Sequence, residues 1–251
     1  MDKSKVVLLF YTLKYLKLRQ FYYRLYHVLR KRIFKIKIEK STVYYPKKLN
    51  WRDGLATSNS YNSGVFTFLN IEHRFDEIDW NYSSYGKLWT YNLNYFDFLN
   101  QDGISKEKCL DLIYNYIERE DELKDGLESY PISLRLINWI KFISKHQIKD
   151  EKIDKAMGRH LSLLNKNLEY HLLGNHLLEN ALSLLFGAYY FGDENKYKRA
   201  KSLLEKELNE QILQDGGHFE LSPMYHKLLL TRLLDSINLI ENNLWKKDDL
   251  L

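Results

Sequence analysis

The feature that most constrains this chain is a regular succession of amphipathic segments between about residue 104 and residue 242. Apolar residues recur there at spacings of three and four, and short turns containing Gly, Pro or Asp separate the segments. Because the turns are short, consecutive helices should lie antiparallel as helical hairpins. The pattern predicts helices near residues 105–121, 132–146, 151–173, 176–191, 194–213 and 223–242.

Several of these predicted helices have recognisable ends. Ser105 and Asp193 are suitable N-cap residues, Pro223 suits a first helical turn, and Gly192 suits a C-terminus. The region from about 41 to 100 differs, because it is rich in aromatic residues and Asn. Its β-rich run at 65–69 predicts one short strand, paired with residues near 71–78, and the rest of that region is predicted to be loop. The expected fold class is therefore all-α, with a short β and loop segment near 60–80.

Composition supports one globular domain with an appendage. The 251 residues are 45% hydrophobic, with only three prolines and eleven glycines, which argues against a disordered or collagen-like chain. The single cysteine, Cys109, excludes an internal disulfide and a thiolate metal site with a second Cys ligand. We expect it to be a small buried hydrophobic residue.

Charge is distributed unevenly along the chain. Residues 1–50 hold fourteen Lys and Arg against two acidic residues, and the remainder is acidic. Residues 5–34 read as a basic amphipathic helix, which either packs on its own domain or contacts a membrane peripherally. Nucleic acid, anionic lipid and acidic polysaccharide are all compatible with such charge. No signal peptide or membrane-spanning segment is evident, so the cellular compartment stays open.

The first segment with candidate chemistry covers residues 174–180, at the start of a predicted helix. Asn175, His176, Glu179 and Asn180 stand at spacings of three and four, so they share one helical face near an N-terminus. Exposed N–H groups and the positive end of the helix dipole favour a bound carboxylate there. This segment is therefore a candidate anion site.

The second segment covers residues 215–226. Paired glycines permit tight backbone geometry, and Pro223 begins a helix that presents Tyr225 and His226 from its first turn. Simpler interpretations remain open for both segments, since Asn175 can merely cap a helix and Tyr225 can be a buried aromatic residue. Spacing alone also leaves open a zinc site or a carboxylate pair for glycoside hydrolysis. The zinc site would use His176 with Glu179, and the carboxylate pair would be Glu179 with Glu220.

Four blocks in this order, residues 88–99, 130–140, 174–180 and 215–226, resemble the N-terminal domain of the heparinase II/III family. The resemblance extends from about residue 44 to 242. It implies an incomplete (α/α) toroid of helical hairpins, followed in the family by a β-sandwich domain, with uronic-acid polysaccharide bound between them. We therefore expect a basic segment at 1–40, a toroid domain at 41–251, and no β-sandwich domain in this chain.

The resemblance also implies roles for three residues. Asn175 neutralises the uronate carboxylate with help from His176, and Tyr225 transfers protons. Neutralising that carboxylate is what makes the neighbouring carbon acidic enough for β-elimination. A further His comes from the sandwich domain in the family. The implied function is a polysaccharide lyase fragment acting on bacterial surface polysaccharide or exopolysaccharide. The alternative is a catalytically incomplete, carbohydrate-binding remnant of such a lyase.

Further residues are expected to contact an acidic polysaccharide substrate. Trp89, Trp139 and Tyr95 can stack on sugar faces, although core packing is equally open for the tryptophans. Arg135 can pair with a carboxylate or a sulfate. The other expected contacts are Asn94, Asn138, Glu179, His218, Glu220 and His226. No cofactor, metal or nucleic-acid partner is expected.

Overall fold

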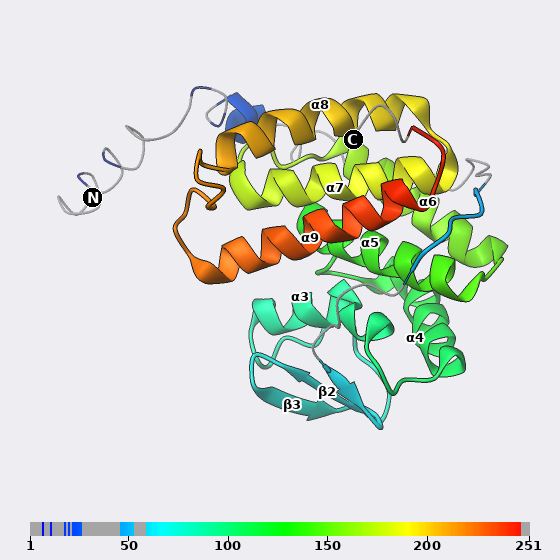
Figure 1. Cartoon of the computed structure of the whole chain (residues 1–251). Helices are drawn as coiled ribbons and strands as arrows, with labels where there is room; N and C mark the ends of the chain where they lie inside the picture. The colour runs from blue at the N-terminus through cyan, green and yellow to red at the C-terminus, as the bar shows by residue number, and fades with distance from the viewer. Residues whose placement is uncertain are drawn as a thin grey trace.

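The computed structural model describes residues 7, 11, 18, 20, 22–26, 46–52 and 59–246. Most of the expected basic helix over residues 5–34 lies outside these residues. The described part of the chain is mostly helical and carries one small antiparallel sheet (Figure 1). The expectation of a predominantly helical fold is confirmed. None of the described helices is long and apolar enough to cross a membrane.

The predicted helices beyond residue 104 all form, with ends that differ by a few residues. Their bounds are α4 Lys106–Glu118, α5 Ser129–His146, α6 Glu151–Lys166, α7 Gly174–Phe191, α8 Glu194–Gln211 and α9 Pro223–Glu241. Short 3-10 helices occupy Asp97–Asn100 (η1) and Glu120–Glu122 (η2). The largest difference is at α6, which ends at Lys166 instead of continuing to 173.

The expected helix ends are confirmed by their hydrogen bonds. The side chain of Ser105 accepts from the Lys108 N–H, and that of Asp193 accepts from the Lys196 N–H. Gly192 ends α7 in the left-handed conformation, with φ of 64°. That conformation is strained for residues with a side chain, so glycine suits this short turn between α7 and α8.

The short β segment is confirmed. The sheet contains β1 Tyr61–Asn62, β2 Val65–Phe68 and β3 Ile71–Arg74, in the order β1-β2-β3. Phe66 pairs with His73, and Phe66 and Phe68 of the central strand are buried. Alternation along β2 thus places one face of the sheet against the helical core.

The prediction of loop between the sheet and residue 100 is wrong for α3, which spans Lys87–Tyr95. Aromatic residues and Asn give this segment weak intrinsic helix propensity, and Gly86 provides no side-chain cap. Trp89 and Leu93 are fully buried against the core. Tertiary packing therefore stabilises a helix that local sequence does not indicate.

Helix α7 lies at the centre of the helical layers and contacts α5, α6, α8 and α9 (Figure 1). It is buried on nearly every side, which explains its almost uniformly apolar sequence. Gly187 allows the close approach of α6, since a Cβ there would lie 2.4 Å from Leu161 Cδ1.

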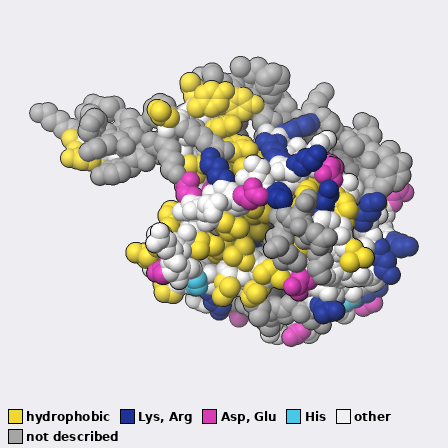
Figure 2. Space-filling model, turned by 45° about the horizontal axis from the view of Figure 1, so that its top comes forward, with side chains coloured by type: hydrophobic (Ala, Val, Ile, Leu, Met, Phe, Trp, Pro, Cys, Tyr) yellow, Lys and Arg dark blue, Asp and Glu magenta, His cyan; other side chains and the backbone are white. Residues whose placement is uncertain are grey.

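Helix α9 is held on this core by two ion pairs. Lys141 Nζ of α5 lies 2.7 Å from Asp235 Oδ2, and Arg232 Nε lies 3.1 Å from Glu179 Oε1 of α7. The outer side of α9 keeps an exposed apolar stripe, formed by Leu230, Leu234 and Ile237. Figure 2 shows hydrophobic side chains gathered on one face of the molecule.

Candidate functional site

A cavity of about 910 Å³ lies where the N-terminal ends of α5, α7 and α9 meet. Helix α3, the loop before α7 and the loop before α9 also line it, together with Gln20, Leu69 and Glu210. The lining residues are Gln20, Leu69, Leu88, Tyr91, Asn92, Tyr95, Glu128, Tyr130, Pro131, Glu169, Leu172, Leu173, Gly174, Asn175, His176, Glu210, Phe219, Glu220, Met224, Tyr225 and Leu228. The structure therefore brings Asn175, His176 and Tyr225 to one cavity.

Two leucines with positive φ precede α7 and α9, the helices whose first turns line this cavity. Leu173 precedes α7 with φ of 62°, and Leu221 lies just before α9 with φ of 52°. A positive φ is uncommon for any residue other than glycine, and for a branched side chain it costs free energy. The fold maintains both at the points where the chain delivers Asn175 and Tyr225.

His176 is oriented by a network that reaches back to α5. Its Nδ1 lies 3.4 Å from Glu169 Oε2, and the same oxygen accepts from Asn180 Nδ2 at 3.2 Å. Asn180 Oδ1 accepts from the Glu169 backbone N–H at 2.8 Å, and its Nδ2 also contacts Ser133 Oγ at 3.1 Å. Glu169 and Asn180 are buried, whereas 45% of the His176 side chain is exposed. The imidazole therefore contacts Glu169 through Nδ1, and part of the ring remains exposed to the cavity.

The half-buried Tyr130 lies next to this histidine, and the buried Tyr95 lies next to Tyr130. The Tyr130 ring centroid is 4.6 Å from that of His176 and 6.0 Å from that of Tyr95. Asn175 lies within hydrogen-bonding range of the Tyr130 side chain. Burial raises the pKa of both tyrosines far above the ordinary value, so both hydroxyls remain protonated. They supply the cavity with neutral hydrogen-bonding groups.

Tyr225 faces the cavity from the first turn of α9. Its ring lies 6.2 Å from that of His218, which is buried beside Gln211. His218 belongs to a tight turn closed by an antiparallel bridge to Ile212. Unlike Tyr225, neither His218 nor the exposed His226 lines the cavity, whereas Glu220 does.

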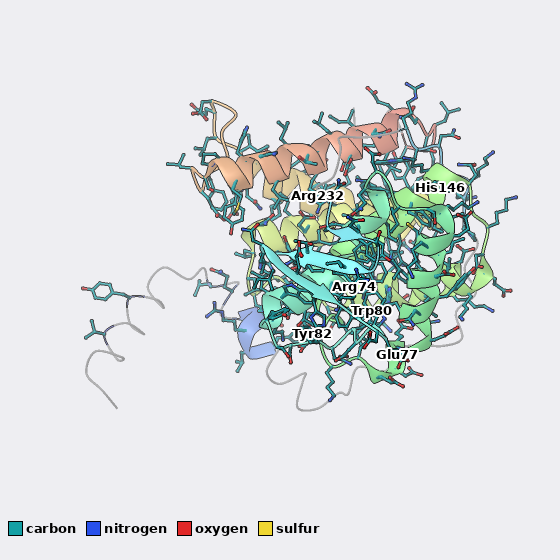
Figure 3. The ribbon with its side chains drawn as sticks, turned by 90° about the horizontal axis from the view of Figure 1, so that it is seen from below. Arg74, Glu77, Trp80, Tyr82, His146 and Arg232 are labelled. Carbon is teal, nitrogen blue, oxygen red and sulfur yellow. The ribbon has the colours of Figure 1, made fainter. Side chains whose placement is uncertain are left out.

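Glu179 lies in the core behind the cavity wall. It is buried, and Arg232 reaches it from the inner side of α9 (Figure 3). Burial lowers the pKa of Arg232, but the nearby Glu179 carboxylate raises it by more. The guanidinium therefore stays charged. Glu179 is not among the residues that line the cavity, so it does not form a facing carboxylate pair with Glu220 there.

The expected sugar contacts of both tryptophans are wrong. Trp89 and Trp139 have no exposed surface. The indole N–H of Trp89 donates to the Ile71 carbonyl at 3.2 Å, and Trp139 packs edge-on against Phe96 at 5.3 Å between centroids. Both tryptophans are core residues. A large aromatic side chain stabilises a fold mainly through the area that it buries.

The expected substrate contact of Arg135 is also wrong. Its side chain is completely buried, and Nη1 donates to the carbonyls of Asn94 and Gly126 at 3.1 and 3.0 Å. The guanidinium lies 4.7 Å from the Tyr116 ring centroid. Asn94 and Asn138 are likewise buried, and they donate to the carbonyls of Trp80 and Tyr95, respectively. These three polar residues join α3 to α5 beneath the cavity.

Sequence reasoning missed Glu169 and Tyr130 as members of the site. Glu169 fell inside the helix predicted over 151–173, whereas the chain actually leaves α6 at Lys166. The asparagines at 165 and 167 are the local signal that favours an earlier helix end. Tyr130 stood in one of the four blocks, but its place in the cavity depends on packing between α5 and α7.

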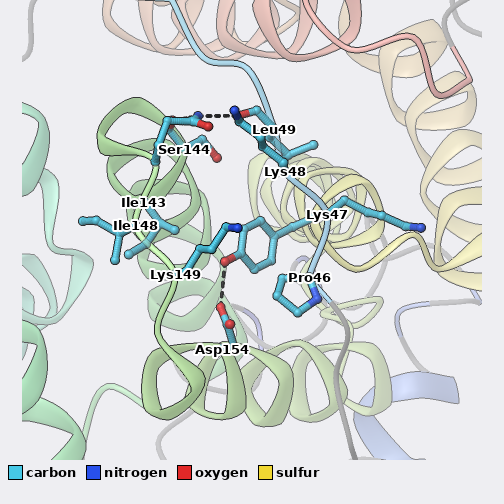
Figure 4. Close-up of a pocket in the computed structure, with 11 residues that line it drawn as sticks. Pro46, Lys47, Lys48, Leu49, Ile143, Ser144, Ile148, Lys149 and Asp154 are labelled. Carbon is cyan, nitrogen blue, oxygen red and sulfur yellow. Dashed lines mark hydrogen bonds between the residues drawn. The ribbon is translucent and has the colours of Figure 1, made fainter.

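A second cavity, of about 280 Å³, lies near the C-terminal end of α7 and shares no lining residue with the first (Figure 4). Lys47, Lys48 and Lys149 are among its lining residues, and Tyr190 Oη donates to Asp154 Oδ1 at 2.7 Å. Burial raises the pKa of Asp154.

Across the described ranges, no group of three or more His, Cys, Asp or Glu side chains is arranged to hold a metal ion.

Comparison with known proteins agrees with the resemblance. Residues 131–248 match the family model described as Heparinase II/III N-terminus. The chain is also 29% identical over 76 residues to a heparin-sulfate lyase of Bacteroides stercoris, a match that covers 29% of this chain and 11% of that protein. No solved structure matches the chain significantly. Residues 131–248, which include most of α5 and all of α6, α7, α8 and α9, therefore carry the similarity to the heparinase II/III N-terminal domain.

Proposed function

We propose that this protein acts in the cleavage of uronic-acid-containing polysaccharide by β-elimination. The observation that carries the proposal is that Asn175, His176 and Tyr225 line one cavity, at the N-terminal ends of α7 and α9. All three belong to the region that matches the lyase family. The family resemblance supplies their roles, and the cavity supplies a place where one sugar ring can meet them together.

Asn175 and His176 act on the substrate carboxylate. The carbon beside that carboxylate loses its proton only when hydrogen bonds neutralise the carboxylate and stabilise the enolate-like species that forms. Both residues stand in the first turn of α7, where unpaired backbone N–H groups and the helix dipole also favour an anion. The protonated hydroxyl of Tyr130 beside Asn175 adds a further polar group to this end of the cavity.

Tyr225 is proposed to transfer a proton during the reaction. A base removes the C5 proton of the uronate, the C4–O bond to the leaving sugar breaks, and a C4–C5 double bond forms. The leaving oxygen takes a proton, so one proton is removed and one is delivered for each bond cleaved. A tyrosine hydroxyl exchanges one proton, which suits Tyr225 to deliver or to remove it.

The remaining features of the proposal come from the family. We propose that the helical hairpins form part of an incomplete (α/α) toroid within a domain over residues 41–251. The cavity then forms one wall of a cleft whose other wall, with a further His, belongs to a β-sandwich domain. The basic segment over residues 5–34 is proposed to contact a membrane surface peripherally.

The similarity to a heparin-sulfate lyase supports an acidic polysaccharide as the substrate class. The test is to incubate the protein with a panel of uronic-acid polysaccharides, including bacterial exopolysaccharides, and to follow the absorbance of unsaturated uronate products. A second series adds the β-sandwich domain of a related lyase in trans. We expect product from at least one polymer in one of the series.

Binding without product in both series would contradict lyase activity. That outcome would identify the protein as a carbohydrate-binding relative of these lyases. Absence of both binding and product across the panel would refute the proposed substrate class as well.

A further inference from the structure

We infer that the cavity selects uronic-acid saccharides of low charge density and rejects sulfated ones. This inference rests on the proposed function and adds to it a substrate class. It comes from the charges that line the cavity and from the groups that supply its attraction for an anion.

The cavity wall is poor in positive charge. Among the lining residues that the structure describes there is no Lys or Arg, and His176 is the single basic side chain. Four glutamates line the same cavity: Glu128, Glu169, Glu210 and Glu220. Proteins that bind sulfate or phosphate groups characteristically use Arg or Lys, whose charge-assisted hydrogen bonds offset the cost of removing the anion from water.

Two described cations that contact residues beside this wall, Lys87 and Arg232, are already paired. Lys87 at the rim lies 2.8 Å from Asp125 Oδ1 and 2.9 Å from Glu128 Oε1. These two acids raise the pKa of Lys87, which therefore stays charged and paired with them, and the pairing also offsets the charge of Glu128. Arg232 is committed to Glu179 in the core. Neither cation is available to a sulfate group inside the cavity.

The attraction for an anion comes instead from helix ends. Helices α5, α7 and α9 each direct their N-terminal turn at the cavity, and each such end carries roughly half of a positive elementary charge. This effect falls off within the first turn, so it suits one carboxylate held against the ends of the helices.

The carboxylate of Glu220 repels a second anionic group on the saccharide. Its side chain is exposed on the cavity wall, five residues before Tyr225. Like charges brought together across a binding surface suppress the wrong ligand. The rim around the glutamates is apolar, with Leu88 56% exposed and Met224 65% exposed. Such a rim fits the C–H faces of uncharged sugar units rather than sulfate groups.

The test compares two oligosaccharides of equal length with the same alternating uronic acid and hexosamine backbone, one unsulfated and one sulfated on the hexosamine. Calorimetry measures the binding of each to the complete chain. We expect the unsulfated compound to bind at least about tenfold more tightly, a modest size for a like-charge contact. Added salt should narrow this difference, because it screens repulsion between exposed charges.

Charge reversal at Glu220 locates the effect. Glu220→Lys should raise affinity for the sulfated compound by about tenfold and leave the unsulfated compound nearly unchanged. Glu205→Lys is the matched control, since it makes the same charge change at an exposed position of α8 outside the cavity. The control should alter the two affinities equally and only slightly.

The binding results distinguish failure of the charge-density inference from failure of the proposed function. Tighter or equal binding of the sulfated compound by the unmodified chain would overturn the charge-density inference and leave the proposed function in place. An equal response of the two compounds to Glu220→Lys would also overturn it. Failure of both compounds to bind, together with failure across the polysaccharide panel, would refute the proposed function itself and this inference with it.

Discussion

Glu169 Oε2 lies 3.4 Å from His176 Nδ1, which joins the loop after α6 to the first turn of α7. An ionised carboxylate only accepts hydrogen bonds, so the contact favours the tautomer of His176 that carries its proton on Nδ1. The partly exposed imidazole is left with Nε2 for a ligand in the cavity. Glu169 is therefore a positioning residue for His176.

We predict that Glu169→Ala changes the tautomer and orientation of His176. Nitrogen NMR of the imidazoles should report a single Nδ1–H tautomer for His176 in the unmodified chain and a mixture in the variant. The reason is that the variant removes the group that accepts the Nδ1 proton. His226, which is exposed on α9, provides an internal control whose signals should not change. An unaltered His176 spectrum would contradict the positioning role.

In an active assembly, we predict that Tyr225→Phe lowers turnover by roughly 10²-fold or more, the usual scale for a lost general acid or base. The substitution keeps the ring and removes the proton that the residue exchanges. Asn175→Ala should act by a comparable factor, because its hydrogen bond strengthens as charge develops on the carboxylate. Steady-state kinetics on a polymer that is cleaved separates turnover from apparent affinity, which should change little.

Tyr61→Phe is the control for this series, since Tyr61 lies in β1 and does not line the cavity. Its kinetics should match those of the unmodified protein. Normal turnover of Tyr225→Phe would exclude Tyr225 as the proton-transfer residue.

We predict that Arg135→Ala acts on folding and not on saccharide affinity. The change removes the donors to the Asn94 and Gly126 carbonyls and leaves a cavity beside Tyr116. The free energy of unfolding should fall by about 3 kcal/mol or more. Urea unfolding measures this loss. Arg74→Ala is the control, because the exposed Arg74 side chain donates to the Ser63 carbonyl at the surface, so its effect should stay below about 1 kcal/mol.

A fourth prediction concerns acid stability and the buried Glu120. Burial raises the pKa of Glu120, but the charge and hydrogen bonds of His160 and Arg159 lower it by more, to a net value of about 2. A lowered folded-state pKa means that the ionised group stabilises the fold above its ordinary pKa of 4.5. This stabilisation is lost as the pH falls from about 4.5 towards 2. The shift corresponds to about 3 kcal/mol.

Glu120→Gln should therefore lower the free energy of unfolding by about 3 kcal/mol at neutral pH, and by progressively less below pH 4.5. Urea unfolding at a series of pH values measures both. Glu118→Gln is the matched control, because Glu118 pairs with Lys152 at the surface, where 64% of its side chain is exposed. Such a pair contributes about 1 kcal/mol or less. Parallel pH profiles of Glu120→Gln and the unmodified chain would contradict the assigned pKa.

Local sequence determined the helices from α4 to α9 and the strand pair β2–β3. Their signals are short-range: apolar residues at helical or alternating spacing, and caps such as Ser105 and Asp193. The order of the four blocks also indicated the similarity to the heparinase II/III N-terminal domain, and it placed Asn175, His176 and Tyr225 at helix starts. None of this required knowledge of how the helices pack.

Tertiary structure alone decided which polar residues face the cavity. Arg135 of α5 and Glu169 of the loop after α6 are both buried residues of an ionisable type. Arg135 is enclosed in the core, whereas Glu169 contacts the His176 side chain at the cavity. Helix α3 shows the same dependence, because burial of Trp89 and Leu93 overcomes weak local propensity. The physical reason is that burial, and the need to pair every buried polar group, depend on contacts between residues far apart in sequence. Periodicity along the chain records which side of a helix is apolar, but not which neighbour covers it.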